Sequence, residues 1–441
     1  MCRLLHFVLY FAIFTSWTGA ASAEKLPFIE AYELAQEAAP NVLIAQYRVD
    51  GAEAQKDVAL GNILPQVSLF GQYSKNEVRY DDAIFFQDQN YPGERYGLQV
   101  RQPILNVANG LEVLRLDLLH DLSREELRIA ETELLTRLVE AFLNVLLSDA
   151  AVEQVNTELK ALDSQLLEAQ ALYARNLVAV TQVLETQARR DAISAEAITA
   201  RGGAAVAREE LLKLTGKRGV EPSAVQENIV LLSRFHSAEE AAAEAVKTSP
   251  GVLAAETAVK AARRAIDRER SRWIPTVDIT YNLQHSDVGF DNLSSPPRDT
   301  STIAIGFNYP IFEGGAGNAR IRGAWSEFNA ANTQLQAEVR NSEARARSAW
   351  LNLEAVGERL VAARQASRSA ETNVAATRKG VQAGTNRVTD VLVALAQKTR
   401  ADREESMAKF QYAMAWVELE MASGADPDAI APVLSAALHG S

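Results

Sequence analysis

The segment Ile63–Ser74, ILPQVSLFGQYS, decides the fold, because it returns 210 residues later as Trp273–Gln284, WIPTVDITYNLQ. In both copies a proline is followed by alternating apolar and polar side chains. This period of two is typical of a β-strand that is apolar on one face. If this similarity reflects a duplicated unit, further landmarks should recur in the same order at a similar offset.

Four further landmarks recur in the same order. They are Pro40 and Pro250 (AAPNVLIA, TSPGVLAA), QPIL at Gln102–Leu105 and YPIF at Tyr309–Phe312, VTQVL at Val180–Leu184 and VTDVL at Val388–Leu392, and Leu214–Gly216 and Ala422–Gly424. Alanine-rich helices resemble one another by chance, but chance would not place prolines and turns in one order. The sequence therefore predicts two copies of one unit, residues 24–216 and 237–424, with a linker at 217–236 and a tail at 425–441.

Each unit is expected to contain a helix, two strands, a very long helix, a break and a shorter helix. The first helix is expected over residues 27–63 and its copy over 237–273. The strands are expected at about 66–80 and 95–103, and at about 276–286 and 300–310, with long polar loops between them. Apolar residues at three-and-four spacing from Leu111 to Leu166 predict a coiled-coil seam on a helix about 100 Å long.

The four strands share an apolar face. Its residues are Val67, Leu69, Tyr73, Leu98, Val100, Val277, Ile279, Tyr281, Ile303, Ile305 and Phe307. A soluble sheet packed on helices would show the same alternation. The long polar loops and the aromatic residues near the strand ends (Tyr80, Trp273, Tyr309, Phe312) instead favour strands of an outer-membrane barrel, with this face toward lipid. Four strands cannot close a barrel, so several chains must contribute.

The N-terminus has the pattern of a secretory signal over residues 1–23. A basic start at Arg3 precedes an apolar run and the tripeptide Ala21-Ser22-Ala23, typical of a cleavage site, although the run could also be an uncleaved anchor. Cys2 is the only cysteine and leaves with the signal, so neither a disulfide nor a lipid anchor is expected. Removal of Arg3 takes the net charge from −12 to −13, which argues against a nucleic-acid partner.

No catalytic, cofactor or metal site is expected. The histidines His120, His236, His285 and His439 lie far apart without the spacing of metal ligands. Gly216-Lys217 lacks the earlier glycine of a phosphate loop. A general porin would need many more strands and has no use for long helices, whereas a soluble periplasmic coiled-coil scaffold remains as the competing interpretation.

Taken together, these motifs resemble the TolC-type outer membrane efflux proteins over essentially all of the mature chain. The resemblance rests on the strand entries LPQVSLFGQY and IPTVDITYNL, the strand exits QPILN and YPIFEGG, and the turn AGTNRVTDVL. It implies a mostly helical homotrimer, with four strands per chain in one 12-stranded membrane β-barrel, continued by a long periplasmic α-helical barrel. The linker and the tail would form a mixed belt at the waist of this tunnel.

The function implied by this resemblance is an export duct. Its partners would be a periplasmic adaptor protein, an inner-membrane transporter and outer membrane lipid, and the transporter would choose drugs, metal ions or type I secreted proteins as cargo. The two helical breaks would form the periplasmic mouth. The resemblance places the pore entrance at Asp390, Arg387, Asn386 and Gln182.

At the two breaks, Gly384 and Asn176 are expected to end helices in a left-handed conformation. Thr181 and Thr389 are expected either to cap the returning helices or to act directly at the entrance. Better-known members have a second acid where this chain has Val393, so the acidic constriction is expected to be thinner. Asp390 fits either an acidic ring that favours cations or a residue that stabilises the first helical turn.

Overall fold

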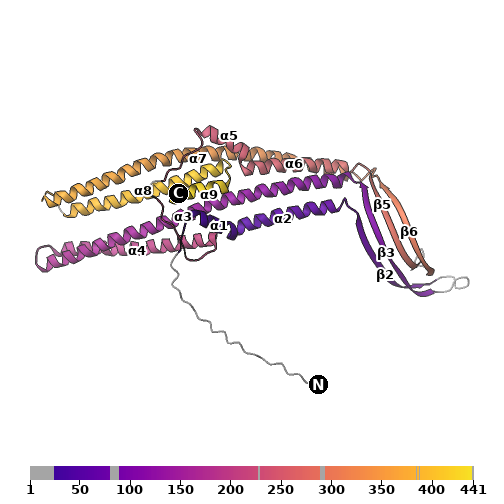
Figure 1. The fold of residues 1–441 in the computed structure, drawn as a ribbon, viewed down its shortest axis with the longest axis horizontal. Coiled ribbons are helices and arrows are strands. Elements are labelled where there is room, and N and C mark those ends of the chain that lie inside the picture. The colour runs from indigo at the N-terminus through magenta and orange to yellow at the C-terminus, as the bar shows by residue number, and fades with distance from the viewer. Residues whose placement is uncertain are drawn as a thin grey trace, which may run out of the picture.

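The chain forms a long rod with a curved sheet at one end (Figure 1). The computed structural model describes residues 24–79, 89–226, 229–288, 294–383, 385–386 and 388–439. Two helical hairpins point away from the sheet and end at the opposite tip of the rod. None of the described helices is long and apolar enough to cross a membrane.

The two halves of the chain have the same order of elements. The first contains α1 (Phe28–Ala38), α2 (Pro40–Gly61), β2 (Gln66–Val78), β3 (Gln89–Leu105), α3 (Val107–Ala174) and α4 (Val180–Thr215). The second contains α5 (Ala238–Thr248), α6 (Pro250–Ser271), β5 (Thr276–Val288), β6 (Ser294–Asn308), α7 (Ala316–Gln382) and α8 (Val388–Ala422). The tail forms α9 (Pro427–His439), and the short strands β1 (Glu24–Leu26) and β4 (Val220–Pro222) complete the chain.

The prediction of one continuous helix before each strand pair was wrong. Pro40 and Pro250 each begin a second helix, because proline has no N–H to donate and is favoured at the first helical position. Pro432 lies inside α9, which continues to His439 although proline has no N–H to donate to the preceding turn.

The four long strands form one antiparallel sheet in the order β2-β3-β5-β6. β3 begins at Gln89 and β6 at Ser294, so both strands extend into the segments expected to be loops. Backbone pairing continues there, as between Val78 and Gln89, although the apolar alternation has ended. Sequence alternation marks only the part of a strand with one apolar face, whereas hydrogen bonding is indifferent to side-chain polarity.

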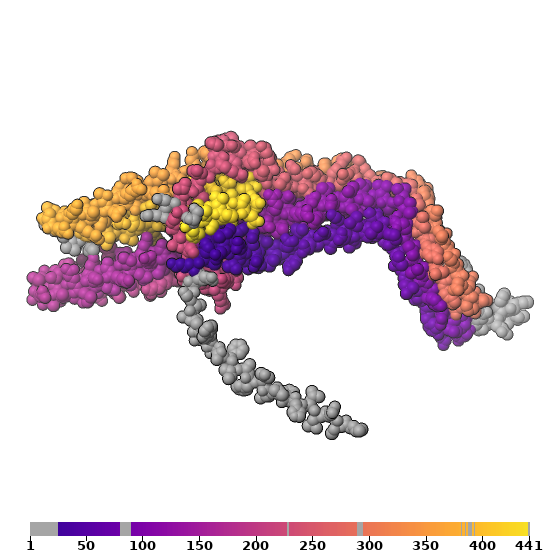
Figure 2. All heavy atoms as spheres, viewed as in Figure 1, coloured from indigo at the N-terminus to yellow at the C-terminus, as the bar shows by residue number. Residues whose placement is uncertain are grey.

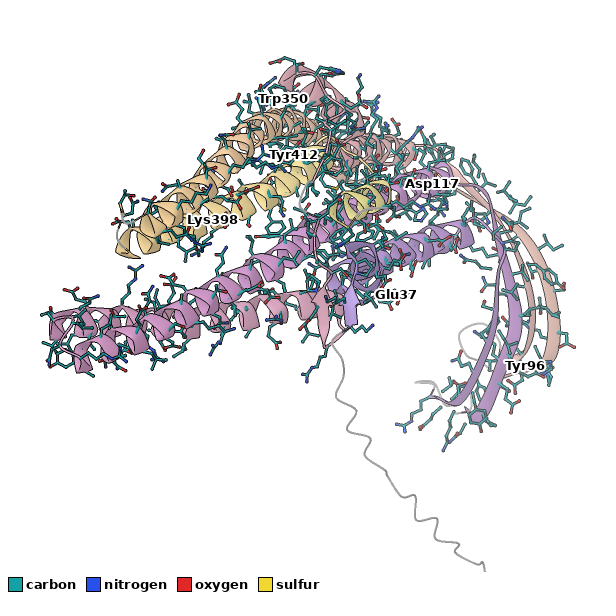
Figure 3. The ribbon with its side chains drawn as sticks, turned by 60° about the vertical axis from the view of Figure 1, so that its left-hand side comes forward. Glu37, Tyr96, Asp117, Trp350, Lys398 and Tyr412 are labelled. Atoms are coloured by element: carbon teal, nitrogen blue, oxygen red, sulfur yellow. The ribbon has the colours of Figure 1, made fainter. Side chains whose placement is uncertain are left out.

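The strand register places the expected apolar residues on one face. Val67 pairs with Val100, which pairs with Tyr281, which pairs with Ile303. The neighbouring row contains Leu69 and Leu98. Leu69 is 84% exposed and Ile303 73% exposed, so the chain itself leaves this face uncovered. Figure 3 shows the side chains of the curved sheet, with Tyr96 labelled toward its far end.

The main core lies at the waist, where the two ends of the chain meet. Phe28 and Phe142 are fully buried and pack edge to face at 5.4 Å between ring centroids. α9 packs against α1, and β1 pairs in parallel with β4. In Figure 2 the C-terminal helix occupies the middle of the rod beside the N-terminal segment. The waist is therefore closed by segments from both termini and from the linker.

Two equivalent glycines end the last helix of each unit and allow a matched stability test. Gly216 and Gly424 have φ angles of 68° and 73°, which disfavour side chains. A Cβ at Gly424 would also lie 2.5 Å from the carbonyl carbon of Thr248, whereas at Gly216 it would meet only the Ala38 Cβ at 3.1 Å. We predict that Gly216→Ala costs about 1 to 2 kcal/mol and that Gly424→Ala costs clearly more.

Thermal unfolding of the two extracted variants, followed by circular dichroism, measures this difference. Equal decreases in the midpoint temperature would show that the backbone approach at Gly424 has no role beyond its φ angle.

Candidate functional site

The turn between α3 and α4, at the tip of the rod, is closed by backbone hydrogen bonds that cap the end of α3. Asn176 has a φ of 54° and donates its N–H to the Tyr173 carbonyl at 2.8 Å. The next N–H, from Leu177, reaches back to the Leu172 carbonyl at 3.0 Å. This is the Schellman pattern, in which a left-handed residue satisfies the last carbonyls of a helix. Asparagine tolerates that conformation better than other side chains, which explains its place here.

The second turn has a related pattern around Gly380. Thr385 donates both its N–H, at 2.8 Å, and its hydroxyl, at 3.0 Å, to the Gly380 carbonyl. The Asn386 side chain lies directly over Gly380, since an added Cβ would be 2.8 Å from its Cγ. Gly384 and Arg387, both predicted site residues, lie outside the described residues.

The prediction that Thr181 caps α4 was wrong. The helix begins at Val180, and Ala179 is the N-cap, with an extended backbone at φ −77° and ψ 151° and no side-chain cap. After the left-handed residue Asn176, the chain becomes helical at Val180, earlier than the sequence suggested. Similarly, α8 begins at Val388, before Thr389, so Thr389 does not occupy the cap position; its side chain is outside the described part.

The described residues that were predicted for the entrance lie at two separate hairpin tips. Gln182 is exposed in the first turn of α4, and Asp390 is exposed in the first turn of α8 (Figure 1). Both hairpin ends point away from the sheet but do not merge into one site within the chain. The position of Asp390 near a helix N-terminus suits a carboxylate in either expected role.

Each hairpin is held in register by polar pairs between its own helices. In the α3–α4 hairpin, Arg190 pairs with Asp163 at 2.9 Å and Arg208 with Asp149 at 2.7 Å. In the α7–α8 hairpin, the Ser367 hydroxyl donates to Asp402 at 2.8 Å. Exposed pairs of this kind contribute little stability individually. They link the two helices of each hairpin at defined positions.

A groove between the two hairpins was not found from the sequence. It has a volume of about 370 Å³ and is lined by α3, α4 and α8, with Leu162 and Leu395 beside Glu153, Glu158 and Asp402. α3 contacts α8 along this region, so the two repeat units meet here. The sequence of one helix does not show which other helix packs against it.

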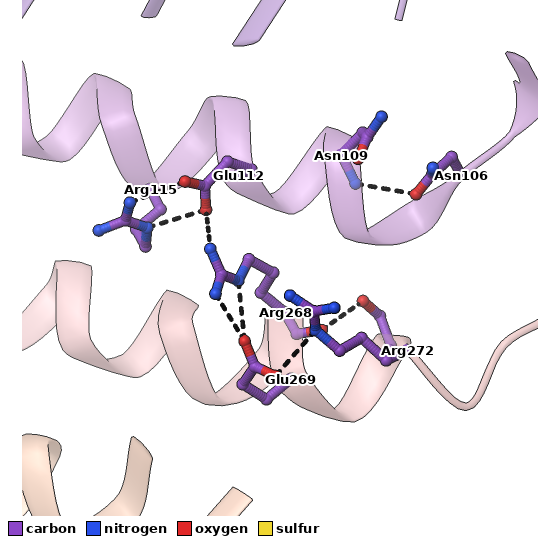
Figure 4. A network of polar contacts seen from close by, with 8 residues as sticks. Asn106, Asn109, Glu112, Arg115, Arg268, Glu269 and Arg272 are labelled. Carbon is purple, nitrogen blue, oxygen red and sulfur yellow. Dashed lines mark hydrogen bonds and ion pairs between the residues drawn. The ribbon is translucent and has the colours of Figure 1, made fainter. Parts of the chain in front are cut away.

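A second unexpected feature is an ionic network where the helices meet the sheet (Figure 4). Arg268 on α6 donates to Glu112 on α3 at 2.8 Å and pairs with its neighbour Glu269 at 2.6 Å. Arg272 also reaches Glu269, at 2.8 Å. Hydrogen bonds from Arg115 and Arg268 lower the pKa of Glu112 to about 2. The network links the first and second repeats directly beside the strands.

At the waist, the tail is fixed by polar side chains. The Tyr32 hydroxyl donates to Asp428 at 2.9 Å, and burial together with this contact raises the pKa of Tyr32. His439 accepts from the Phe28 N–H at 3.1 Å and contacts the Ala224 carbonyl at 3.1 Å through its other ring nitrogen. Within the described residues, no group of three or more His, Cys, Asp or Glu side chains could hold a metal ion.

The comparisons with known proteins agree with this architecture. Residues 31–217 and 241–425 match the family model for outer membrane efflux proteins. The chain belongs to the outer membrane efflux protein family. It is therefore an outer membrane efflux or secretion channel that extends into the periplasm, and it is a transporter and not an enzyme.

Curated relatives match along most of their length. The chain is 25% identical to the alkaline protease secretion protein AprF of Pseudomonas aeruginosa, covering 91% of this chain and 85% of that protein. It is 24% identical to the outer membrane protein TolC of Escherichia coli, covering 93% and 84%.

Solved channel structures share the fold of this efflux protein. The Campylobacter jejuni CmeC outer membrane channel aligns with a TM-score of 0.78 at 14% identity, covering 93% of this chain and 89% of that one. VceC of Vibrio cholerae aligns with a TM-score of 0.73 at 19% identity, covering 90% and 96%.

The network around Glu112 predicts a pH dependence of stability. Because the pKa of Glu112 is lowered from 4.5 to about 2 in the folded protein, its ionised form stabilises the fold above pH 4.5. This contribution is lost as the pH falls toward 2. We predict that Glu112→Gln is less stable than the parent protein near neutral pH, and that the difference shrinks on acidification.

Acid unfolding curves from pH 6 to about pH 2, recorded by circular dichroism, test this. Glu133→Gln is the matched control, since Glu133 is exposed and pairs with the exposed Arg137. If the stability of Glu133→Gln also approached that of the parent protein on acidification, the effect would reflect a general loss of charge.

Proposed function

We propose that three copies of the chain form one export duct, with their sheets closed into a 12-stranded barrel. The observation that supports this most is the four-stranded sheet itself. Within the described residues, β2 and β6 are its two edges, and one of its faces is apolar and uncovered. In lipid, each unpaired backbone group costs several kcal/mol, so open edges must pair with another chain.

In this proposal the apolar rows of the sheet face lipid and the opposite face lines a water-filled lumen. Ser68, Gln99, Asn282 and Thr302 form one cross-strand row of polar residues on that opposite face. The helices α2, α3, α6 and α7 continue from the strands and would form the wall of the periplasmic tunnel. The linker 217–236 and the tail 425–441 would surround its waist.

The duct has partners at its periplasmic end. The hairpin tips would meet an inner-membrane transporter and a periplasmic adaptor protein, and the transporter would choose the cargo. Relatives named for alkaline protease secretion and for secretion of proteases support protein export as one cargo class for this duct. The chain would form the path along which cargo is exported and would not supply the energy for export.

The entrance would lie where three copies bring their hairpin tips together. Three Asp390 carboxylates near a threefold axis would form an acidic ring, with Asn386, Gln182 and Arg387 around it. Such rings favour cations in water-filled pores. Gly384 and Asn176 would shape the two turns that hold these side chains at the rim.

Adjacent residues on β6 test which face meets lipid. Ile303 belongs to the apolar row, whereas Thr302 pairs with Asn282 on the other face. We predict that Ile303→Arg weakens membrane insertion by about 2 to 4 kcal/mol, as for a cation near the bilayer midplane. Thr302→Arg, pointing into water, should be much better tolerated. The yield of trimer in outer membrane fractions measures both effects.

Equal losses for the two arginine variants would show that the faces are assigned wrongly. Recovery of the parent protein in a detergent-free soluble fraction would instead favour the periplasmic scaffold.

The entrance is tested by Asp390→Asn in a planar bilayer. We predict a smaller cation preference, seen as a reversal potential closer to zero in a salt gradient, with little change in trimer stability. Glu196→Gln, an exposed substitution in the middle of α4, is the charge-matched control. An unchanged reversal potential together with a less stable trimer would show that Asp390 only stabilises its helix.

A further inference from the structure

The end of α6 next to the sheet has an unusual concentration of arginine. Residues 260–272 contain six basic and two acidic residues, a net charge of +4. The equivalent stretch of the first repeat, residues 50–62, contains one basic and three acidic residues, a net charge of −2. The whole chain has a net charge of −12, so this basic stretch is not a consequence of overall composition. Of the two copies of the unit, only the second has this basic stretch.

Two of these arginines are arranged differently from the ionic network beside them. Arg268 and Arg272 pair with Glu269, as described above. The Arg263 and Arg270 guanidiniums instead lie 5.5 Å and 5.6 Å from the ring centroid of Trp325 on α7. Among the described residues neither forms an ion pair with a carboxylate, and both side chains belong to exposed residues.

Stacking on an aromatic ring fixes a guanidinium but leaves its N–H groups available. An arginine held in this way has donors arranged to bind a phosphate oxygen pair. Phe328 packs edge to face on Trp325 at 5.7 Å, which holds the indole in place. We refer to Arg263, Arg270 and Trp325 as the arginine clamp.

The clamp lies next to the boundary between helices and sheet. α6 ends at Ser271 and β5 begins at Thr276, so Arg270 lies at the bend between helices and sheet (Figure 1), and Arg263 lies about two turns earlier on α6. At the same boundary Ile311 is 80% and Phe312 81% exposed. Exposed apolar side chains beside cationic ones are typical of the level of lipid headgroups. Since the sheet lies on one side and the long helices on the other, this level is that of the periplasmic leaflet.

We propose that the arginine clamp binds the phosphate of anionic phospholipid headgroups in the periplasmic leaflet of the outer membrane. The inference rests on the proposed insertion of the sheet into that membrane. Each protomer would have one lipid site, on its second repeat. The acidic first repeat would have none. Bound lipid would then anchor the channel at a defined depth, where the long helices leave the bilayer.

The test uses the full mature protein in a non-ionic detergent, titrated with phosphatidylglycerol or with phosphatidylcholine. Bound lipid is counted by native mass spectrometry. We expect preferential binding of phosphatidylglycerol, and we expect Arg263→Gln with Arg270→Gln to weaken it about tenfold or more, because each cation near an anionic surface contributes to the attraction. Arg263→Lys with Arg270→Lys, which keeps the charge, should retain part of the preference.

The control removes two arginines far from the sheet, Arg201→Gln and Arg378→Gln, and should bind lipid like the parent protein. Equal binding of both lipids by the parent would overturn the proposal, as would equal loss in the control. Inorganic phosphate that competes as strongly as the lipid would show a free-anion site instead. Membrane insertion of the variants, measured in parallel, separates failure of the clamp from failure of the proposed insertion.

Discussion

The structure depends on one constraint, the pairing of backbone groups at the edges of a small sheet. Each half of the chain provides two strands, and the two pairs join as β3 and β5 in the middle. The chain covers neither β2 nor β6 within the described residues, and it leaves the apolar face of all four strands open. In lipid there is no water to form hydrogen bonds with the backbone groups at these edges. In the proposed barrel, pairing between chains meets this requirement at both edges.

The long helices continue from the strands into the periplasm. At the bend, Arg268 and Glu112 connect the two repeats immediately below the strands, so the sheet is joined to a wall of adjacent helices. At the waist, Phe28, Phe142 and α9 form the largest buried cluster. Toward the tips the apolar core thins, and polar pairs hold each hairpin in register. Stability is therefore concentrated near the middle, while the ends that would meet partner proteins contact one another less.

Much of this architecture could be predicted from the sequence because it is periodic. The strand faces follow from alternation at Val67, Leu69 and their copies, and the register places these residues in common rows. Asparagine at 176 was sufficient to predict a left-handed helix end, since few other side chains allow it. The Thr181 cap failed because the turn becomes helical earlier, at Val180, which no local signal marks. The Glu112–Arg268 contact and the hairpin groove join distant segments, and a single sequence does not report which helices become neighbours.

The central claim is that β2 of one chain pairs with β6 of the next, and disulfide trapping tests it directly. Cys2 is the only cysteine in the sequence and lies in the expected signal, so we expect no competing thiol. We would combine Leu69→Cys on β2 with Ile303→Cys, Ile305→Cys or Phe307→Cys on β6 to sample the register. Within one chain these strands are separated by β3 and β5, about 14 Å at normal strand spacing, too far for a disulfide. Oxidation in outer membranes should give a covalent ladder that ends at three chains in at least one register; no cross-link in any register, or a ladder that passes three, would contradict the closed trimeric barrel.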